Sequence, residues 1–436
     1  MNQALPIHRS VAATRPRYAD RIAGFFIPLC LFVEPANFFM LTTADFYEVD
    51  RFAVPISLVL SPFFLLFVFN SRFHQYFRGG MFLFLVVIFC LYCLVMGALN
   101  AVMRSPDAIL FAYQWIIPFV WIPYFLTIMG TERFKTFMRW FLIGVIANIG
   151  WYGASTIIEF VAYGGLGDAG RMSQNRILPG QYQIAVYVPT AISFAMSLLN
   201  AMFFSKELKI SRKFLLMING GALIVLLALA SREGLLTYLL STILLFAARS
   251  PYLRAALFFG GFIAGAMLII NLNAIFEAFA ASDFRMLNKI ASLQNEGAQF
   301  GGRDMMIRES IKVFFWDPLF GSGFLPPNVS VFGDGILAPS AHNMYVDAFV
   351  WCGLFGGLAF LAISARLVYG SVMMIVSQRL KQDHLYLSLF GVVLMVFMVV
   401  SNNLNVPMRQ PIISPLIGLM IAAVIYQAML RRKARR

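Results

Sequence analysis

Charged residues are scarce in this sequence: Asp, Glu, Lys and Arg together make up only 12% of its 436 residues. Soluble proteins carry about 25%. A soluble chain of this length would form about two or three water-facing domains, and the charge needed to cover their surfaces is missing. Hydrophobic residues, at 60%, take its place. The composition therefore excludes the soluble enzyme classes and predicts a polytopic integral membrane protein.

Cysteine and histidine are also rare, with four of each. All four cysteines lie in or beside apolar stretches, and no histidine or carboxylate accompanies Cys90 and Cys93 on their shared helix face. The acidic residues form no Asp-x-Asp pair, the pattern typical of a divalent-metal site. We therefore expect the cysteines to be small core residues, and we expect no metal and no other cofactor.

Long apolar runs, by contrast, are abundant. A helix that crosses a membrane needs about 20 mostly apolar residues, and the sequence predicts an all-α fold with about twelve such helices. Their expected ranges are 21–43, 53–70, 81–103, 108–130, 138–163, 181–204, 213–230, 234–248, 255–279, 343–365, 385–404 and 409–430. Over residues 353–378, a glycine-rich helix either continues towards Gln378 or breaks.

These spans divide the chain into five parts. A cytoplasmic tail (1–20) precedes spans one to nine (21–279), a long periplasmic loop (280–342) follows, and spans ten to twelve (343–430) lead to a basic cytoplasmic tail (431–436). The first apolar run has no small-residue cleavage site and is predicted to be an uncleaved anchor. No repeat of fixed period is visible.

The positions of Lys and Arg set the orientation, because these residues accumulate on the cytoplasmic side. Most of the 34 basic residues fall on the side of the N-terminus. We therefore expect both termini in the cytoplasm of a bacterial inner membrane. The net charge of +14 is then a topology signal and a contact with anionic membrane lipids. A nucleic acid is not expected as a partner, since no soluble domain presents a basic face.

Two outer connections are long. The first, 164–180, is rich in turn formers and carries Arg171 and Arg176. The second, 280–342, is too long for a structureless connector. Within it, residues 303–316 (RDMMIRESIKVFFW) alternate apolar and charged residues at helical spacing, which predicts a short helix at the membrane interface. Long loops on a rigid scaffold often carry function.

His342 is the only histidine expected outside, at the start of a helix for which Ser340 is a candidate N-cap. Imidazole titrates near neutral pH, so it can accept a proton from a sugar hydroxyl. The structural alternative is a histidine that only makes hydrogen bonds at the interface.

Two outer arginines are candidates for binding an anion. Arg232 lies in a very short connection between two apolar helices, where a charge is costly and usually has a partner. Arg303 follows two glycines and opens the predicted interfacial helix, whose N-terminal N–H groups favour anions. The guanidinium group binds phosphate oxygens at two points. A local salt bridge or a lipid-headgroup anchor would explain Arg232 equally well.

The segments 301–324 and 340–361 resemble the signature region of the O-antigen ligase and Wzy-type polymerase family. His342-Asn343, nine residues and then Gly353-Leu-Phe-Gly356 are similar to the family pattern His-Asn-x9-Gly-x-x-Gly. The stretch 231–236 (SREGLL) resembles the Ser-Arg-Gly stretch of the family, with Glu233 where glycine is commoner. Residues 171–185 resemble its second outer segment more loosely. The resemblance covers roughly 170–365.

The resemblance implies a glycosyltransferase that moves a glycan from an undecaprenyl diphosphate carrier to an acceptor sugar at the outer face, without metal. Arg232 and Arg303 would bind the diphosphate, and His342 would activate the acceptor hydroxyl. Direct attack would invert the anomeric configuration. Arg171 and Arg176 are candidates for the diphosphate or sugar path. Asn343, a further candidate for substrate binding, could instead orient His342 or cap the helix.

Within the family, a polymerase extends O-antigen or exopolysaccharide repeat units on the carrier, whereas an O-antigen ligase moves the chain to lipid A-core in lipopolysaccharide biosynthesis. Polymerases serve more kinds of surface polysaccharide, so the polymerase is preferred, with a chain-length co-polymerase as a candidate partner. A polysaccharide transporter or flippase would show interrupted helix pairs and charges at mid-membrane, and neither is visible. A peptidoglycan polymerase of the shape-and-division family would need a catalytic carboxylate motif that is not evident.

Overall fold

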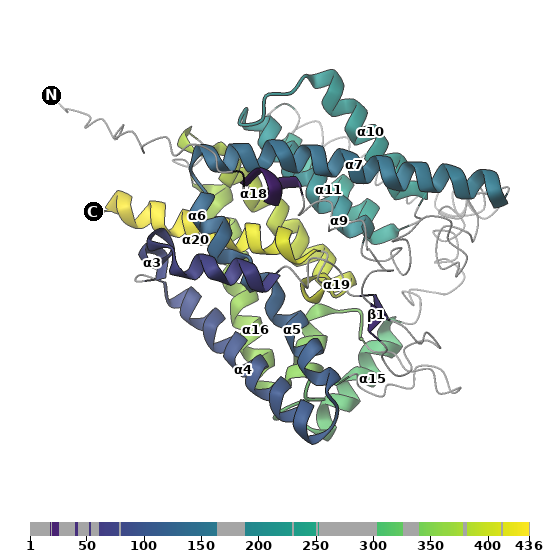
Figure 1. The fold of residues 1–436 in the computed structure, drawn as a ribbon, viewed down its shortest axis with the longest axis vertical. Coiled ribbons are helices and arrows are strands. Elements are labelled where there is room, and N and C mark those ends of the chain that lie inside the picture. The colour runs from purple at the N-terminus through teal and green to yellow at the C-terminus, as the bar shows by residue number, and fades with distance from the viewer. Residues whose placement is uncertain are drawn as a thin grey trace.

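The computed structural model is almost wholly helical in the part of the chain that it describes (Figure 1). Its one pair of strands in that part, β1 (Met40–Leu41) and β2 (Phe52–Ala53), is antiparallel and two residues long. The described residues are 18, 20–25, 40–41, 52–53, 61–77, 80–163, 188–228, 231–249, 252, 303–325, 340–377, 382–410 and 413–435. Because this part of the chain is almost wholly helical, the all-α prediction is confirmed.

The helices follow the predicted apolar runs closely. In chain order they are the 3-10 turn η1 (Leu65–Phe69), α3 (Ser71–Phe77), α4 (Met81–Met103), α5 (Asp107–Val120), α6 (Ile122–Ile128), α7 (Glu132–Tyr163), α9 (Val188–Phe204), α10 (Arg212–Ala228), α11 (Arg232–Arg249), α15 (Arg303–Trp316), α16 (Met344–Val376), α18 (Leu385–Val396), the π-helical turn η2 (Phe397–Ser401), α19 (Asn402–Leu404), the 3-10 turn η3 (Pro407–Arg409) and α20 (Ser414–Arg435).

Five helical segments in the described residues are long and apolar enough to cross a membrane. They are Met81–Met103, Asp107–Ile128, Met344–Val376, Leu385–Leu404 and Ser414–Arg432. Each coincides with a predicted span, which supports a multi-pass membrane protein. The predicted number of about twelve is not confirmed. One reason is that α9 is apolar but only 17 residues long, and another is that the predicted span 255–279 lies outside the described residues.

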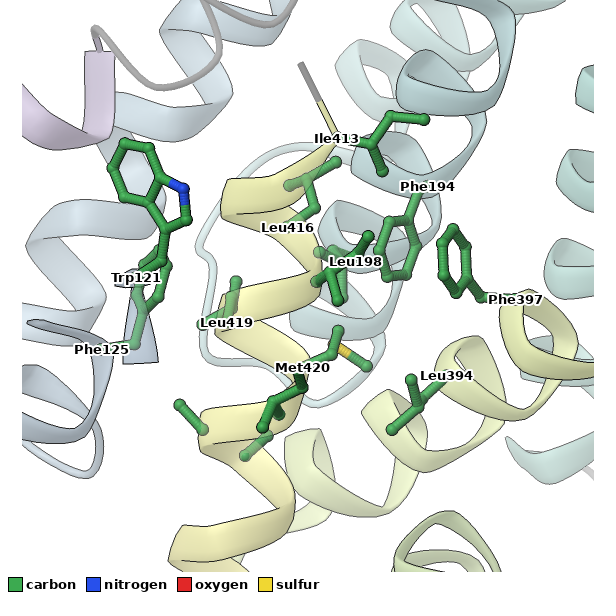
Figure 2. Packing of buried hydrophobic residues seen from close by; sticks show 14 of the residues in the cluster. Trp121, Phe125, Phe194, Leu198, Leu394, Phe397, Ile413, Leu416, Leu419 and Met420 are labelled. Carbon is green, nitrogen blue, oxygen red and sulfur yellow. The ribbon is translucent and has the colours of Figure 1, made fainter. Parts of the chain in front are cut away.

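Helix α20 lies at the centre of the packed core (Figure 2). Its buried Leu416, Leu419 and Met420 lie between α5–α6 on one side and α9 and α18 on the other. On the far side of α20 the rings of Phe194 and Phe397 stack with their centroids 4.6 Å apart. This core fixes the helices whose ends carry the polar residues described below.

Helix α4 presents an apolar face that other described residues leave uncovered. Met81, Phe84, Leu91 and Val102 expose between 55% and 88% of their surface. An apolar face of this size fits contact with lipid acyl chains. The face therefore supports placing α4 at the lipid boundary of the protein.

Helix α15 forms over the residues predicted for an interfacial helix. Phe315 and Trp316 at its end are 70% and 76% exposed, and Phe320 in the following turn is 44% exposed. Aromatic residues of this kind gather at the membrane–water interface. The helical part of the prediction for the long loop is confirmed for 303–316.

Residues from segments predicted to share the cytoplasmic side contact one another. Asp20 and Arg133 are buried and form a two-point ion pair, with Arg133 Nε 2.7 Å and Nη2 2.8 Å from the carboxylate oxygens. Lys135 Nζ lies 3.5 Å from a carboxylate oxygen of Glu207. Contacts of this kind are expected when the spans alternate in direction, because these segments then lie on the same side of the membrane.

The turn 317–325 packs against α16 at Gly353, where the helix is kinked. Gly353 interrupts α16, because its φ of +64° and ψ of −169° are non-helical. The glycine-rich helix therefore breaks at this residue, and a second helical part runs on to Val376. Gly353 has φ +64°, a conformation that glycine adopts without steric cost, and Ser322 N donates to the carbonyl of Val350 at 2.8 Å. A Cβ on Gly353 would overlap the carbonyl of Leu319. The turn therefore packs on α16 only because residue 353 lacks a side chain.

Gly353→Ala is expected to lower the stability of the folded protein by at least about 2 kcal/mol. The backbone conformation of Gly353, with φ +64° and ψ −169°, is essentially restricted to glycine and costs other residues about 1–3 kcal/mol, and the added Cβ would also overlap the carbonyl of Leu319. Gly150→Ala is the matched control, because a Cβ added at this position in α7 would meet no atom within 4 Å. Thermal melting of both variants in detergent tests the prediction. Equal melting temperatures would contradict it.

Candidate functional site

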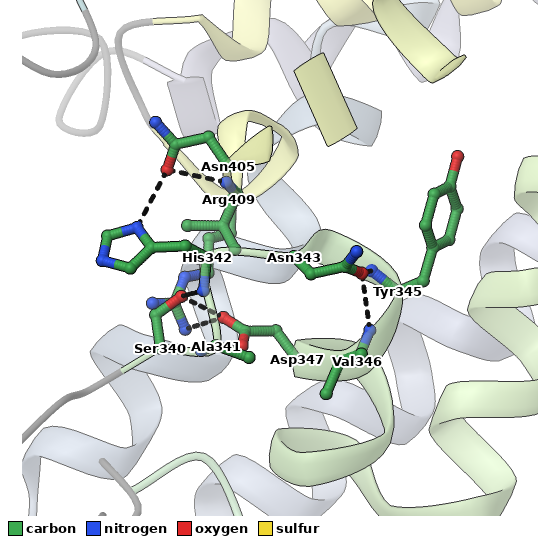
Figure 3. Close-up of polar contacts among 10 residues, drawn as sticks. Ser340, Ala341, His342, Asn343, Tyr345, Val346, Asp347, Asn405 and Arg409 are labelled. Atoms are coloured by element: carbon green, nitrogen blue, oxygen red, sulfur yellow. Dashed lines mark hydrogen bonds and ion pairs between the residues drawn. The ribbon is translucent and has the colours of Figure 1, made fainter. Parts of the chain in front are cut away.

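His342 lies in a short loop held by a buried carboxylate at the start of α16 (Figure 3). Asp347, 1% exposed, accepts a hydrogen bond from Ser340 Oγ at 2.7 Å and another from Ala341 N at 2.7 Å. The backbone N–H of His342 in turn donates to Ser340 Oγ at 3.0 Å. These bonds hold His342 at φ +51°. Such a conformation is uncommon for residues other than glycine and is frequent at functional sites.

Arg409, at the end of η3, packs against the same carboxylate. Its Nη1 lies 3.6 Å from Asp347 Oδ2, and its guanidinium lies 4.3 Å from the centroid of the Trp351 ring. Arg409 is 6% exposed. Within the described residues, its Nε and Nη1 have no hydrogen-bond acceptor. The ion pair and the stacking join the His342 loop to the connection between α19 and α20.

Asn343, not Ser340, is the N-cap of α16. Asn343 Oδ1 accepts from the backbone N–H groups of Tyr345 and Val346 at 3.0 and 3.1 Å. The prediction that Ser340 caps this helix is therefore wrong, because its hydroxyl is engaged with Asp347. Of the two structural roles considered for Asn343, the structure has the capping role.

A chain of polar contacts links His342 to α11. His342 Nδ1 lies 3.5 Å from Asn405 Oδ1, at the outer limit of a hydrogen bond. Asn405 Nδ2 donates to Glu233 Oε2 at 2.9 Å, and Thr190 Oγ1 donates to Glu233 Oε1 at 3.1 Å. Asn405 and Glu233 are 1% and 6% exposed, while His342 is half-buried. The imidazole is thus the most exposed member of this chain.

Arg232 is the first residue of α11 and has an exposed side chain. The next side chain, Glu233, is buried on another side of the helix, as the sequence predicts. Ser231 Oγ accepts from Gly234 N at 3.2 Å and caps the helix. Because Glu233 contacts Asn405, the start of α11 lies close to the His342 loop.

Arg303 opens α15, as predicted, although its side chain lies outside the described residues. Helix α15 packs on α16, with the rings of Phe314 and Phe349 in edge contact at 5.9 Å. Arg171 and Arg176 lie in 164–187, which the structure does not describe. Nothing in the structure tests the roles expected of these three arginines.

No group of three or more His, Cys, Asp or Glu side chains that could hold a metal ion occurs in the described part of the chain. Cys93 and Cys352 are fully buried and Cys90 is partly buried. These positions agree with cysteines that act as core residues.

The sequence pattern did not indicate the roles of Asn405, Arg409 and Asp347. One signal was present: residues 401–405 read Ser-Asn-Asn-Leu-Asn at the end of an apolar span. Polar residues are costly at such a position and are usually functional or paired. This run indicates a polar site, but it does not predict which residue each side-chain amide contacts.

The fold and the site together define a multi-pass membrane protein with a polar site where its helices begin and end. Residues 215–361 match the family model described as O-antigen ligase. The matched segment is about a third of the chain and contains Arg232, Arg303 and His342. The resemblance drawn from the motifs is confirmed, and it supports a membrane protein of the O-antigen ligase and polymerase type with an enzymatic role. No curated protein matches the chain.

Proposed function

We propose that this protein is a membrane glycosyltransferase that moves an undecaprenyl-diphosphate-linked glycan onto an acceptor sugar. The observation that carries the proposal is the half-buried imidazole of His342, held by buried polar groups beside the start of α11, where Arg232 lies. The O-antigen ligase match over 215–361 supports the same class of reaction.

The proposal includes an arrangement in the membrane. About twelve helices span the bacterial inner membrane, both termini are cytoplasmic, and the His342 site is periplasmic. The distribution of basic residues supports this orientation. The pairing of Asp20 with Arg133 and of Lys135 with Glu207 supports the placement of these segments on one and the same side of the membrane.

In the proposed reaction, the acceptor hydroxyl gives its proton to the imidazole of His342 while its oxygen attacks the anomeric carbon of the donor glycan. The new glycosidic bond forms as the bond between that carbon and the diphosphate oxygen breaks. The lipid diphosphate leaves with the electron pair, so its negative charge grows in the transition state. Fixed positive charge in a site with little water stabilises this growth. No metal or cofactor is needed to balance the step.

Arg232 and Arg303 supply the positive charge in this proposal. Arg232 is exposed at a helix start, and Arg303 opens α15, whose N-terminal N–H groups add to the attraction for an anion. Arg171 and Arg176 are assigned to the path of the diphosphate or sugar. Asn343 caps α16 through its Oδ1 and holds the loop in place, and it is also assigned to substrate binding.

We assign the protein as a polymerase of O-antigen or exopolysaccharide repeat units, because more kinds of surface polysaccharide need a polymerase than need a ligase. The description of the matched family makes an O-antigen ligase, acting on lipid A-core, the second candidate. The partners of the polymerase are the lipid-linked donor, a carrier-linked acceptor glycan and a chain-length co-polymerase.

Purified protein in liposomes, given lipid-diphosphate-linked repeat units and a metal chelator, tests the function. A ladder of products without lipid A-core is expected for a polymerase. Product on lipid A-core alone would replace the polymerase by the ligase. No product under either condition would contradict the proposal.

In the same assay, Arg232→Ala and Arg303→Ala are each expected to lower kcat/KM for the lipid-linked donor about tenfold or more. The reason is that each variant loses a hydrogen bond to a charged group, worth about 1.5–3 kcal/mol. Arg308→Ala is the control, because Arg308 lies on α15 with an exposed side chain and no assigned role. If both variants keep the kcat/KM of the wild type, the diphosphate assignment is wrong.

A further inference from the structure

The orientation of the Asn405 side chain is determined by its neighbours. Both carboxyl oxygens of Glu233 accept hydrogen bonds, one from Asn405 Nδ2 and the other from Thr190 Oγ1. On its other side, Asn405 Oδ1 accepts from Val406 N at 3.0 Å. Exchanging the amide oxygen and nitrogen would set donor against donor and acceptor against acceptor. The amide oxygen therefore faces His342.

A carbonyl oxygen beside a ring nitrogen selects a tautomer. In neutral imidazole one nitrogen carries the proton and the other carries the lone pair. A lone pair on Nδ1 would face the Asn405 Oδ1 at 3.5 Å and be repelled, whereas a proton on Nδ1 is attracted to it. The contact partner of one ring nitrogen thus decides which nitrogen is basic.

We infer that Glu233, acting through Asn405, holds the imidazole of His342 in the Nδ1–H tautomer, so that Nε2 is the nitrogen that accepts the proton. Asn405 and Glu233 are positioning residues, because they act through His342. Catalytic bases are commonly oriented by a third group in this way. The inference rests on the proposed function for its catalytic meaning, whereas the tautomer itself can be observed without substrate.

The inference also explains why position 233 is a glutamate in a stretch where the resembled family more often has glycine. Glycine offers no acceptor, so Asn405 Nδ2 would lose its bond. In this chain the carboxylate is supplied by the residue directly after Arg232. The start of α11 thereby serves two roles: an exposed cation for the donor and a buried acceptor that orients the base.

Nitrogen NMR of protein labelled with ¹⁵N in its four histidines tests the tautomer. The spectrum is recorded in detergent at about pH 8, where imidazole is neutral, and the His342 signals are identified by their loss in His342→Gln. The wild type is expected to show a protonated Nδ1 and an unprotonated Nε2. A protonated Nε2 in the wild type would overturn the inference.

Variants separate the positioning role from a merely structural one. Asn405→Leu and Glu233→Ala are expected to shift His342 towards the Nε2–H tautomer, while Glu233→Gln, which keeps an acceptor, retains Nδ1–H. Ser241→Ala is the matched control on α11, since this buried hydroxyl has no hydrogen-bond partner among the described residues. If Asn405→Leu does not fold, the two Glu233 variants and the wild-type spectrum still decide. An unshifted tautomer in Glu233→Ala would contradict the role of Glu233.

Transfer in liposomes supplies the second readout. Glu233→Ala is expected to lower kcat about tenfold to a hundredfold, as the loss of an outer partner of a functional imidazole does, with KM for the donor unchanged. A matching rise in KM would contradict positioning. If the tautomer is as inferred and the wild type transfers no glycan, the proposed function fails and the tautomer assignment remains. If the wild type transfers glycan but His342 carries its proton on Nε2, the tautomer assignment is overturned and the proposed function stands.

Discussion

His342→Ala is expected to lower the rate of glycan transfer about 100- to 10,000-fold, the usual contribution of a general base. The imidazole is half-buried at the start of α16. It contacts Asn405, which follows α19 and is in turn held by Glu233 of α11. The loop around it is held by backbone bonds that do not involve the ring. We therefore expect the variant to fold, and product formation in liposomes measures the loss.

His74→Ala is the control for this variant. His74 is exposed on α3, in a segment assigned to the cytoplasmic side, and it has no role in the proposed reaction. Its transfer rate should equal that of the wild type. A His342→Ala protein that melts like the wild type and also transfers glycan at the wild-type rate would remove the base assignment.

Asp347→Ala is expected to destabilise the protein by about 3–5 kcal/mol, because it leaves the buried Arg409 without its partner. It also removes the acceptor for Ser340 Oγ and Ala341 N, so the His342 loop loses its support. Transfer should fall together with stability. Thermal melting and the fraction of protein that elutes as a single species in detergent measure the first effect.

The double variant Asp347→Ala, Arg409→Met distinguishes the two effects. Removing the unpaired cation should recover part of the melting temperature, since a buried pair can often be replaced by apolar residues. The transfer rate should stay low, because the loop still lacks its acceptor. A single Asp347→Ala variant as stable as the wild type would contradict the account of this ion pair.

Local patterns were enough to predict much of the fold. The run 81–103 is apolar throughout and forms α4 over the same residues, and the helical spacing in 303–316 predicts α15. These features depend on residues close together in the sequence. The cap of α16 was assigned to Ser340 because serine is a common N-cap, and it was wrong because Asp347, a residue inside the helix, binds that hydroxyl.

The site was harder to predict because its contacts join distant parts of the chain. His342 could be singled out by its position in the topology, and Arg232 by its place between two apolar helices. Asn405 and Glu233, however, meet across 172 positions in the sequence, and His342 and Asn405 across 63. Only the packing of α11 on η2 and of α16 on α19 brings these residues together. No periodicity along the chain carries that information.

The anomeric configuration of the transferred glycan tests the central claim most directly. In the proposed reaction, a single displacement takes place at the anomeric carbon, with His342 as the base and lipid diphosphate as the leaving group. The configuration of the new linkage should therefore be opposite to that of the donor. NMR coupling constants of the donor and of the product made in liposomes measure both configurations. We expect the wild type to form a product of inverted configuration and His342→Ala to lose that product. Retention of the donor configuration would contradict the account.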